Sequence, residues 1–488
     1  MSELKKSVRL NVLLSMTAAM ILCCSLLLPP GIAAAGEEGQ AAPLNPEFLK
    51  YQAEQQLTRT QAPKTQDGYM KGYLPSPVDD SHLKGKSVFL GAAPIPASYD
   101  LRTKNKLTPV RDQGNCGSCW TFSAMASLES YRMPKVSSDY SEGALNEFHG
   151  FDYKPCAGGS NKMATAYFAR WSGPVAENDF PYGYPWMSNS ATTPHVSERS
   201  APLHIQNVIY LPNRANFQDN DTIKQALMEY GAVGIAYSHK NDNYNSETFS
   251  YYNPDADDTD HVVAIVGWDD SWSKDKFNTA PEGDGAFIVR NSWGKAWGDG
   301  GYFYMSYYDA SLWIGTVFCS AQSATNYNWI YQYDYLGDTQ YYGYGDETGW
   351  MANIFLTNPK AAQLQAVSLY AASYQTPYEI YIYANATPGN PISGTLLTKL
   401  TGTFETAGYH TVKLSAPVKV TGKFFSVVAK LQTPGTNFPI PMERPISGYS
   451  ERALALENQS FVSHDGADWK DLAKQYKNTN VCIKAFAQ

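Results

Sequence analysis

The sequence predicts an α+β protein in which a first domain of mixed helices and strands is followed by an all-β sandwich. A helix-like run extends from Trp120 to Tyr131, and an apolar, strand-like run follows His261. About 165 residues come after this first domain, enough for a core of their own. Turn clusters separate their strand-like segments, which are 364–370, 378–383, 410–414 and 423–430. This pattern is typical of a β-sandwich.

Residues 1–35 are expected to form a secretory signal. Lys5, Lys6 and Arg9 make a basic start, an apolar run covers 12–28, and the small residues Ala33–Ala35 suit a signal peptidase. The alternative is an uncleaved membrane anchor, but two prolines at the end of the apolar run favour cleavage. The mature chain is therefore expected to be secreted or held at the cell surface, without a membrane segment, where disulfides persist.

The stretch from 113 to 120 carries the clearest chemical signal. Cys119 stands immediately before the helix-like run, and the positive end of a helix dipole favours its thiolate, the form that attacks acyl groups. Cys116 and Cys119 also make a C-x-x-C pattern, the redox motif of thioredoxin-like proteins. A thiol protease needs in addition a histidine base and a group that orients it.

Two later blocks supply these groups. His261 opens the apolar run, and Asn291 stands two residues before Trp293. The three blocks, in this order, resemble the papain-like cysteine proteases over about 94–308. The resemblance implies a two-lobed fold, in which a helical lobe and a β-barrel-like lobe enclose a cleft. The segments 224–228 and 232–236 are the helix and the strand that enter the second lobe.

The resemblance assigns a role to each matching residue. It implies that Cys119 is the nucleophile, that His261 is the base that later protonates the leaving amine, and that Asn291 orients the imidazole. Gln113 corresponds to the oxyanion-hole donor, which acts together with the backbone N–H of Cys119. Trp293 corresponds to the ring that keeps water from the hydrogen bond between His261 and Asn291.

A disulfide and a substrate-binding segment are also implied. Cys116 corresponds to a cysteine that pairs with the one before a glycine pair, which is Cys156 here. Gly158 and Gly159 then line the cleft and hydrogen-bond an extended substrate, since glycine permits close approach; a plain turn is the alternative. The bulky residue that usually follows these glycines is absent, so the sequence assigns no pocket preference.

The resemblance divides the chain as well. Papain-like proteases are generally made as zymogens, so residues 36–92 are the candidate propeptide, with a flexible linker as the alternative. Within it, 44–58 suits a short helix. The protease domain is expected over 93–318. The β-sandwich over 319–488 resembles lectin-like domains of some prokaryotic surface proteases, which makes cell-wall glycan a candidate ligand. The tyrosines between 327 and 344 either stack on sugars or pack a domain interface.

Five cysteines follow the signal, and two of them have no assignment in the protease pattern. In an exported protein, Cys319 and Cys482 either bridge the end of the protease domain to the C-terminus or remain as two buried thiols.

The composition excludes several classes of function. A formal charge of −8 argues against nucleic acid and anionic membranes as partners. There is no zinc, P-loop or dinucleotide pattern, so neither a metal nor a cofactor is predicted. Residues 253–260 hold four aspartates and suggest a solvated acidic loop more than a calcium site. The charge of this loop would raise the pKa of His261 or favour basic substrates.

Together these features predict an exported, papain-like cysteine endopeptidase, made as a zymogen, that cleaves proteins or peptides through a thioester acyl-enzyme. Two alternatives stay open. One is a surface adhesion protein that binds glycan and in which the protease domain is accessory. The other is thiol–disulfide exchange through Cys116 and Cys119.

Overall fold

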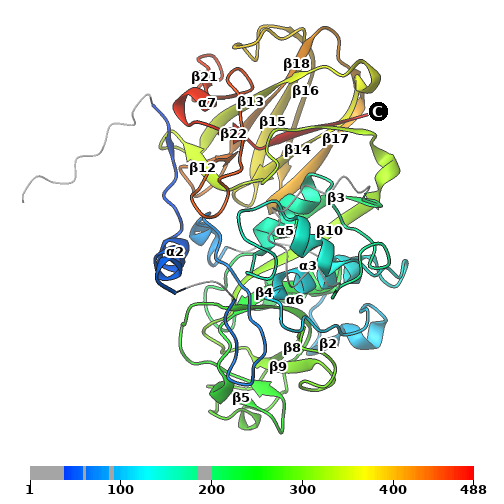
Figure 1. Cartoon of the computed structure of the whole chain (residues 1–488), viewed down its shortest axis with the longest axis vertical. Helices are drawn as coiled ribbons and strands as arrows, with labels where there is room; N and C mark the ends of the chain where they lie inside the picture. The colour runs from blue at the N-terminus through cyan, green and yellow to red at the C-terminus, as the bar shows by residue number, and fades with distance from the viewer. Residues whose placement is uncertain (1–37, 59–61, 87–92, 184–200) are drawn as a thin grey trace, which may run out of the picture. The chain divides into compact units, whose positions relative to one another are not determined.

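The structure, a computed structural model, describes residues 38–58, 62–86, 93–183 and 201–488 (Figure 1). The predicted signal over residues 1–35 lies outside the described residues. None of the described helices combines the length and the apolar character that a membrane crossing requires.

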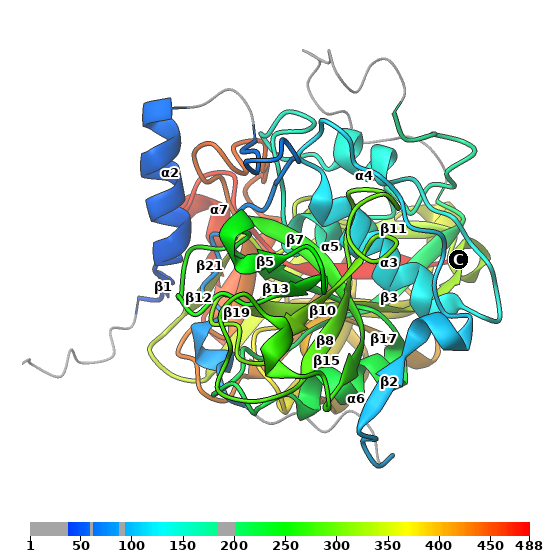
Figure 2. The same ribbon diagram turned by 90° about the horizontal axis from the view of Figure 1, so that it is seen from below.

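Three helices build the first lobe: α3 (Cys119–Arg132), α4 (Glu142–Phe148) and α5 (Asn161–Ala169). The first, labelled in Figure 2, corresponds to the predicted helix over 120–131. Its residues from Cys119 to Ser130 are all buried. Serines fasten this helix to the strands beside it. The Oγ of Ser123 donates to the carbonyl of Val263, and the Oγ of Ser130 accepts from the N–H of Ala232. The helix therefore lies inside the protein and holds its N-terminus in a fixed place.

The second lobe is an antiparallel sheet. The helix α6 (Asp221–Tyr230) leads into it, as predicted. Its longer strands are β3 (Leu203–Tyr210), β4 (Val233–Tyr237), β7 (His261–Asp269), β8 (Ala286–Arg290), β9 (Tyr302–Ser306) and β10 (Trp313–Ser323). Short strands add to it, namely β2 (Ser98–Asp100), β5 (Tyr244–Asn245) and β6 (Ser250–Tyr251). Every residue of β4 and β8 is buried, which explains their continuous apolar sequences. The two-lobed prediction is confirmed.

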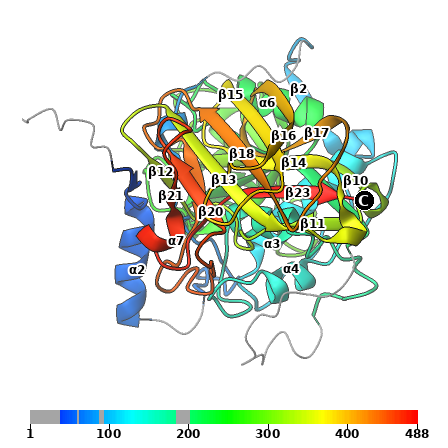
Figure 3. The same ribbon diagram turned by 90° about the horizontal axis from the view of Figure 1, so that it is seen from above.

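The C-terminal part is a β-sandwich, as predicted. One sheet has the order β16 (Thr395–Phe404), β15 (Thr376–Ala384), β18 (Phe424–Gln432), β13 (Thr348–Leu356), β20 (Ser460–Ser463), β21 (Lys470–Asp471) (Figure 3). Against it pack β14 (Gln363–Ala371), β17 (Ala407–Lys419) and β23 (Ile483–Ala487), next to β11 (Trp329–Tyr331). Val367, Ile380, Val427 and Ile483 share the core between them.

The second lobe and the C-terminal β-sandwich share one sheet. Residues Ala407–His410 of β17 pair antiparallel with Asn207–Tyr210 of β3, so strands of both parts form one continuous sheet. The predicted boundary between 318 and 319 falls inside β10, which continues to pair with β3 as far as Ser323. Backbone hydrogen bonds therefore connect the sandwich to the lobe that carries His261.

The described residues of 39–86, called the N-terminal segment below, contact both the protease lobes and the β-sandwich. Its strand β1 (Gln40–Ala41) pairs with β12 (Gln340–Gly343), in a small sheet completed by β19 (Ile440–Glu443) and β22 (Asn480–Val481), beside α7 (Leu472–Gln475). Its helix α2 (Pro46–Thr58) fits the predicted helix. Phe48 of α2 is fully buried, with its ring 5.5 Å from that of Tyr449.

The tyrosines between 327 and 344 mostly pack the interior. Tyr327, Tyr331, Tyr341, Tyr342 and Tyr344 are all buried, whereas Tyr335 is 47% exposed. Of the two alternatives for these residues, packing is therefore the one that the structure favours.

The second disulfide considered from the sequence is absent. Cys319 and Cys482 are both buried free thiols. Cys319 lies on β10 with its Sγ 3.6 Å from the carbonyl of Asn207 on β3, whereas the N–H of Cys482 donates to Pro441 on β19. Cys482 directly precedes β23, and three strands, β14, β17 and β3, lie between β23 and β10 in the sheet. This strand order was not visible in the sequence positions of the two cysteines.

Candidate active site

Cys119 is the first residue of α3, and its side chain is fully buried. Its Sγ accepts a hydrogen bond from the N–H of Val262, 3.4 Å away. Val262 directly follows His261 on β7, so the start of this strand lies against the N-terminus of α3. Burial raises the pKa of the Cys119 thiol to about 12, against the lowering effect of the Val262 N–H.

His261 is oriented by Asn291, the residue that follows β8. The Nε2 of His261 donates to the Oδ1 of Asn291 at 2.9 Å, and the buried Nδ1 has no hydrogen-bond partner among the described residues. The Trp293 ring stacks on the imidazole at 4.5 Å and covers this hydrogen bond. The second ring nitrogen is thereby left for the thiol, in the tautomer with the proton on Nε2.

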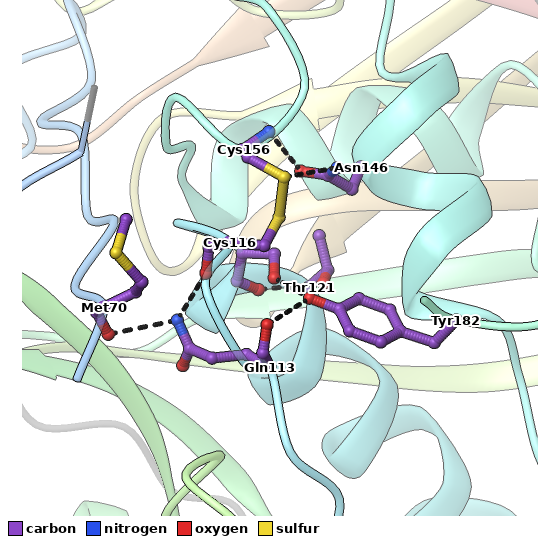
Figure 4. The surroundings of a disulfide bond; sticks show 8 residues. Met70, Gln113, Cys116, Thr121, Asn146, Cys156 and Tyr182 are labelled. Atoms are coloured by element: carbon purple, nitrogen blue, oxygen red, sulfur yellow. Dashed lines mark hydrogen bonds between the residues drawn. A yellow bond between two sulfur atoms is a disulfide. The ribbon is translucent and has the colours of Figure 1, made fainter. Parts of the chain in front are cut away.

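The side chain of Gln113 is held so that its amide nitrogen is presented as a donor. The Oγ of Ser292 donates to the Oε1 of Gln113 at 2.6 Å, and the N–H of Gln113 donates to the carbonyl of Ser292. The Nε2 of Gln113 donates to the carbonyls of Cys116, at 2.8 Å, and Met70, at 3.1 Å (Figure 4). The Gln113 amide is therefore already hydrogen-bonded to a carbonyl oxygen of the N-terminal segment.

The N-terminal segment covers the whole site. The Met70 carbonyl also accepts from the Nε1 of Trp293 at 3.0 Å, and the Tyr69 ring stacks on Trp293 at 5.0 Å. Lys71 forms an ion pair with Asp260, the residue before His261. Cys119 and His261 are both 0% exposed with this segment in place.

Gly159 holds the segment as an extended chain. The N–H of Gly159 donates to Gly72 at 2.9 Å, and its carbonyl accepts from Leu74 at 2.9 Å. A Cβ on Gly72 would lie 2.3 Å from the carbonyl oxygen of Gly117, and one on Gly158 would lie 3.0 Å from that of Gly72. Gly158 also has a φ of 115°, which favours glycine. These glycines let two backbones meet at contact distance.

A disulfide fixes the loop that carries these glycines. Cys116 and Cys156 are joined, with an S–S length of 2.10 Å, as the resemblance implied (Figure 4). The Oδ1 of Asn146 on α4 accepts from the N–H of Cys156 at 3.1 Å. The cross-link holds the residues before Cys119 against the residues before Gly158. It also leaves Cys119 as the one free thiol of the C-x-x-C pair.

The electrostatics describe a neutral, closed site. Burial, together with a smaller effect of the positive charge of Lys71, lowers the pKa of His261 to about 3. With the raised pKa of Cys119, this keeps both groups uncharged. Removing the segment would let water reach Cys119 and His261. Their charged forms, the thiolate and the imidazolium, would then no longer be destabilised by burial.

Comparisons with known proteins agree with this geometry. Residues 95–322 match the papain family cysteine protease domain, and residues 330–487 match a lectin-like domain. The chain is 33% identical over 219 residues to a cathepsin L-like peptidase of Aedes aegypti, covering 43% of this chain and 59% of that protein. It is 30% identical over 232 residues to the cysteine endopeptidase Rep1 of Oryza sativa subsp. japonica, covering 46% and 58%. The chain thus spans about three fifths of the length of these relatives.

A solved structure matches both parts together. It is the crystal structure of the cysteine protease and lectin-like domains of Cwp84, a surface layer associated protein of Clostridium difficile. It aligns with a TM-score of 0.77 and 25% identity, over 92% of this chain and 98% of that one. This chain carries a papain-family cysteine protease domain followed by a lectin-like domain. Cwp84 after propeptide cleavage aligns with a TM-score of 0.69 and 27% identity, over 80% and 99%.

The acidic loop of the protease domain does not act on His261 as expected. Lysines neutralise it, because Asp260 pairs with Lys71, and Asp257 pairs with Lys240. The pKa of His261 is lowered, not raised, because burial outweighs the hydrogen bond to Asn291.

The protease domain places the sequence-predicted residues Cys119, His261, Asn291, Gln113 and Trp293 together. Sequence reasoning missed the groups that complete the site. Ser292 lies next to Asn291, and its hydroxyl orients Gln113. Met70 and Lys71 lie in a segment with no motif of its own. Only the fold shows where this segment runs.

Proposed function

We propose that this protein is an exported cysteine endopeptidase that hydrolyses peptide bonds through a thioester acyl-enzyme and is made as a zymogen. The observation that carries the proposal is the thiol of Cys119 at a helix N-terminus, beside a histidine that Asn291 orients and Trp293 covers. The substrates are proteins or peptides.

The mechanism follows from these positions. The Cys119 Sγ, as thiolate, attacks the scissile carbonyl carbon, and the carbonyl π electrons move onto oxygen. The Nε2 of Gln113 and the N–H of Cys119 stabilise that oxyanion. When the C–N bond breaks, the imidazolium of His261 gives its proton to the leaving amine. Water, deprotonated by His261, then attacks the thioester and releases the acid and the thiol.

A cut within a chain, rather than at its end, is supported by the path of the N-terminal segment. Residues 70–74 pass from the Gln113 donor to Gly159, and the chain continues on both sides of this stretch. Before Met70 it turns back as a hairpin, in which Lys64 pairs with Met70. A site with room for chain on both sides suits an endopeptidase.

Residues 36–92 are the proposed propeptide, because the Met70 carbonyl occupies the Gln113 donor that the oxyanion needs. Residues 1–35 are the proposed signal, 93–318 the protease domain and 319–488 the lectin-like domain. Export is supported by the apolar run over 12–28 and by the disulfide. The location is therefore the exterior or the cell surface. Cell-wall glycan is the proposed ligand of the lectin-like domain, supported by its family match.

The proposal is tested with the chain lacking residues 1–35 and an epoxysuccinyl inhibitor of cysteine proteases, read by intact mass and peptide mapping. The inhibitor should alkylate Cys119 once the N-terminal segment has been cleaved away, and should leave Cys319 and Cys482 untouched. If the folded, cleaved protein forms no adduct, the peptidase proposal is wrong, and the glycan-binding adhesion protein takes its place.

Acid is expected to loosen the N-terminal segment. Burial lowers the pKa of His261 from 6.5 to about 3, and that of His239 well below 6.5, so the closed site holds both imidazoles neutral. Closure is therefore fully stabilised above pH 6.5 and loses stability as the pH falls towards 3, by up to about 1.4 kcal/mol per unit for each histidine. Burial also raises the pKa of Asp260 and of Glu47 on α2, and these two carboxyl groups oppose the trend at the acid end of the range.

Hydrogen exchange of residues 62–74, measured in a Cys119→Ala chain to prevent self-cleavage, checks this prediction. Exchange should accelerate between pH 6.5 and pH 4, while far-UV circular dichroism over the same range shows that the chain remains folded. Equal protection at both ends of the range would contradict the expected role of the buried histidines.

A further inference from the structure

A pocket opens beside Gly159 under the N-terminal segment. Its volume is about 310 Å³. The segment forms one side of it, with Tyr73 and Asp80, and the protease domain forms the other. The residues of the protease domain that line it include Ser160, Lys162, Tyr210, Ala236, Trp313 and Thr316. Tyr73, the residue of the segment that pairs with Gly159, lines this pocket, so a chain bound at Gly159 can direct a side chain towards it.

Lys162, in the first turn of α5, carries a buried charge in the wall of the pocket. Its side chain is 10% exposed. The Nζ lies 2.9 Å from a carboxylate oxygen of Asp338, 3.1 Å from one of Asp80, and 3.9 Å from the centre of the Tyr210 ring. Burial alone would lower the pKa of Lys162, but the two carboxylates raise it overall, so the ammonium keeps its charge.

The two carboxylates come from different parts of the chain. Asp338 belongs to the lectin-like domain, as the match over 330–487 places it, and it stays when the N-terminal segment leaves. Asp80 belongs to the segment and leaves with it. An ammonium has three N–H donors, and the departure of Asp80 leaves one of them without its carboxylate in a pocket next to Gly159.

We propose that Lys162 is the specificity-determining residue of the open cleft and selects substrates with a glutamate or aspartate near the scissile bond. This inference rests on the proposed peptidase function. The substrate carboxylate takes the position that Asp80 holds in the closed chain, where the structure already accommodates a carboxylate on Lys162. A neutral side chain leaves the charged donor unpaired, and a basic one meets a like charge.

The lectin-like domain tunes this selection through Asp338. Its carboxylate, 2% exposed, neutralises part of the Lys162 charge that the substrate meets. The charge of the pocket residue Lys162 is therefore balanced in part by a residue outside the protease domain.

The test uses the full chain from which the N-terminal segment has been cleaved, with pairs of fluorogenic peptides that carry Glu or the isosteric Gln at one of the four positions before the cut. At one position, kcat/KM should favour Glu over Gln by about 10- to 100-fold, the value of one charge-assisted hydrogen bond. Lys162→Met should bring the Glu/Gln ratio at that position to about one. Lys224→Met is the matched control, because Lys224 is also buried and paired, with Asp270, but does not line the pocket. It should keep the wild-type ratio.

Asp338→Asn provides a second variant in case Lys162→Met does not fold, and it should increase the Glu/Gln ratio. The role of Lys162 is overturned if both peptides are hydrolysed with no preference for Glu at any position. It is also overturned if neither variant changes the Glu/Gln ratio. Either result leaves the peptidase proposal standing. No hydrolysis of any peptide together with no inhibitor adduct overturns both.

Discussion

Replacing Cys119 by alanine is expected to abolish peptide hydrolysis by the cleaved chain. The thiol is the atom that forms the acyl-enzyme, and loss of a covalent nucleophile in a protease lowers kcat on the order of 10⁶-fold. The Nδ1 of His261 has no hydrogen-bond partner among the described residues, so this nitrogen is available to the thiol. Steady-state hydrolysis of a fluorogenic peptide measures the effect.

The chain provides matched controls for this variant. Cys319 and Cys482 are also buried free thiols, and alanine at either removes a sulfur of the same kind. Both control variants should keep their kcat. Circular dichroism of the Cys119→Ala chain should match wild type, because the change removes one atom beside a cleft. Hydrolysis by Cys119→Ala at the wild-type rate would show that another residue is the nucleophile.

Gly72→Ala is expected to expose Cys119 in the uncleaved chain. A Cβ at this position would lie 2.3 Å from the backbone oxygen of Gly117, which the disulfide holds in place, so the segment must lift. Water then returns to the thiol. A fall of the pKa from about 12 towards the ordinary value near 8.5 raises the thiolate fraction at pH 7 on the order of 10³-fold.

The initial rate of alkylation of Cys119 by iodoacetamide, located by peptide mapping, measures this change. Gln66→Ala is the control, because Gln66 lies in the same segment but is exposed. It should react as slowly as wild type. If Gly72→Ala reacts no faster than Gln66→Ala, the segment does not protect the thiol by close packing against Gly117.

The residues of the catalytic motif were predictable because each lies within a short, specific pattern. Cys119 precedes a helix, His261 opens an apolar strand, and Asn291 stands near a tryptophan, so local sequence carried both structure and chemistry. The alternation of residues between 364 and 430 likewise predicted the sandwich. No such pattern surrounds Met70 or Lys71, whose importance comes from where an extended segment crosses the fold.

Residues distant in the sequence escaped prediction for the same reason. Asp80, Lys162 and Asp338 meet at one pocket although they lie in three parts of the chain. Of the two alternatives for Cys319 and Cys482, the structure shows two buried free thiols, because β14, β17 and β3 separate the strands at which they lie.

The sequence by itself determined the two domain types and the residues of the thiol site, since helix dipoles, apolar strands and motif spacing act over short stretches of chain. Only the tertiary structure decided that the site is closed and neutral and that the Met70 carbonyl accepts the hydrogen bond of the Gln113 amide. It also decided that Lys162 is paired with Asp338 of the other domain. Burial and charge pairing depend on which segments pack together, and those segments come from distant parts of the chain.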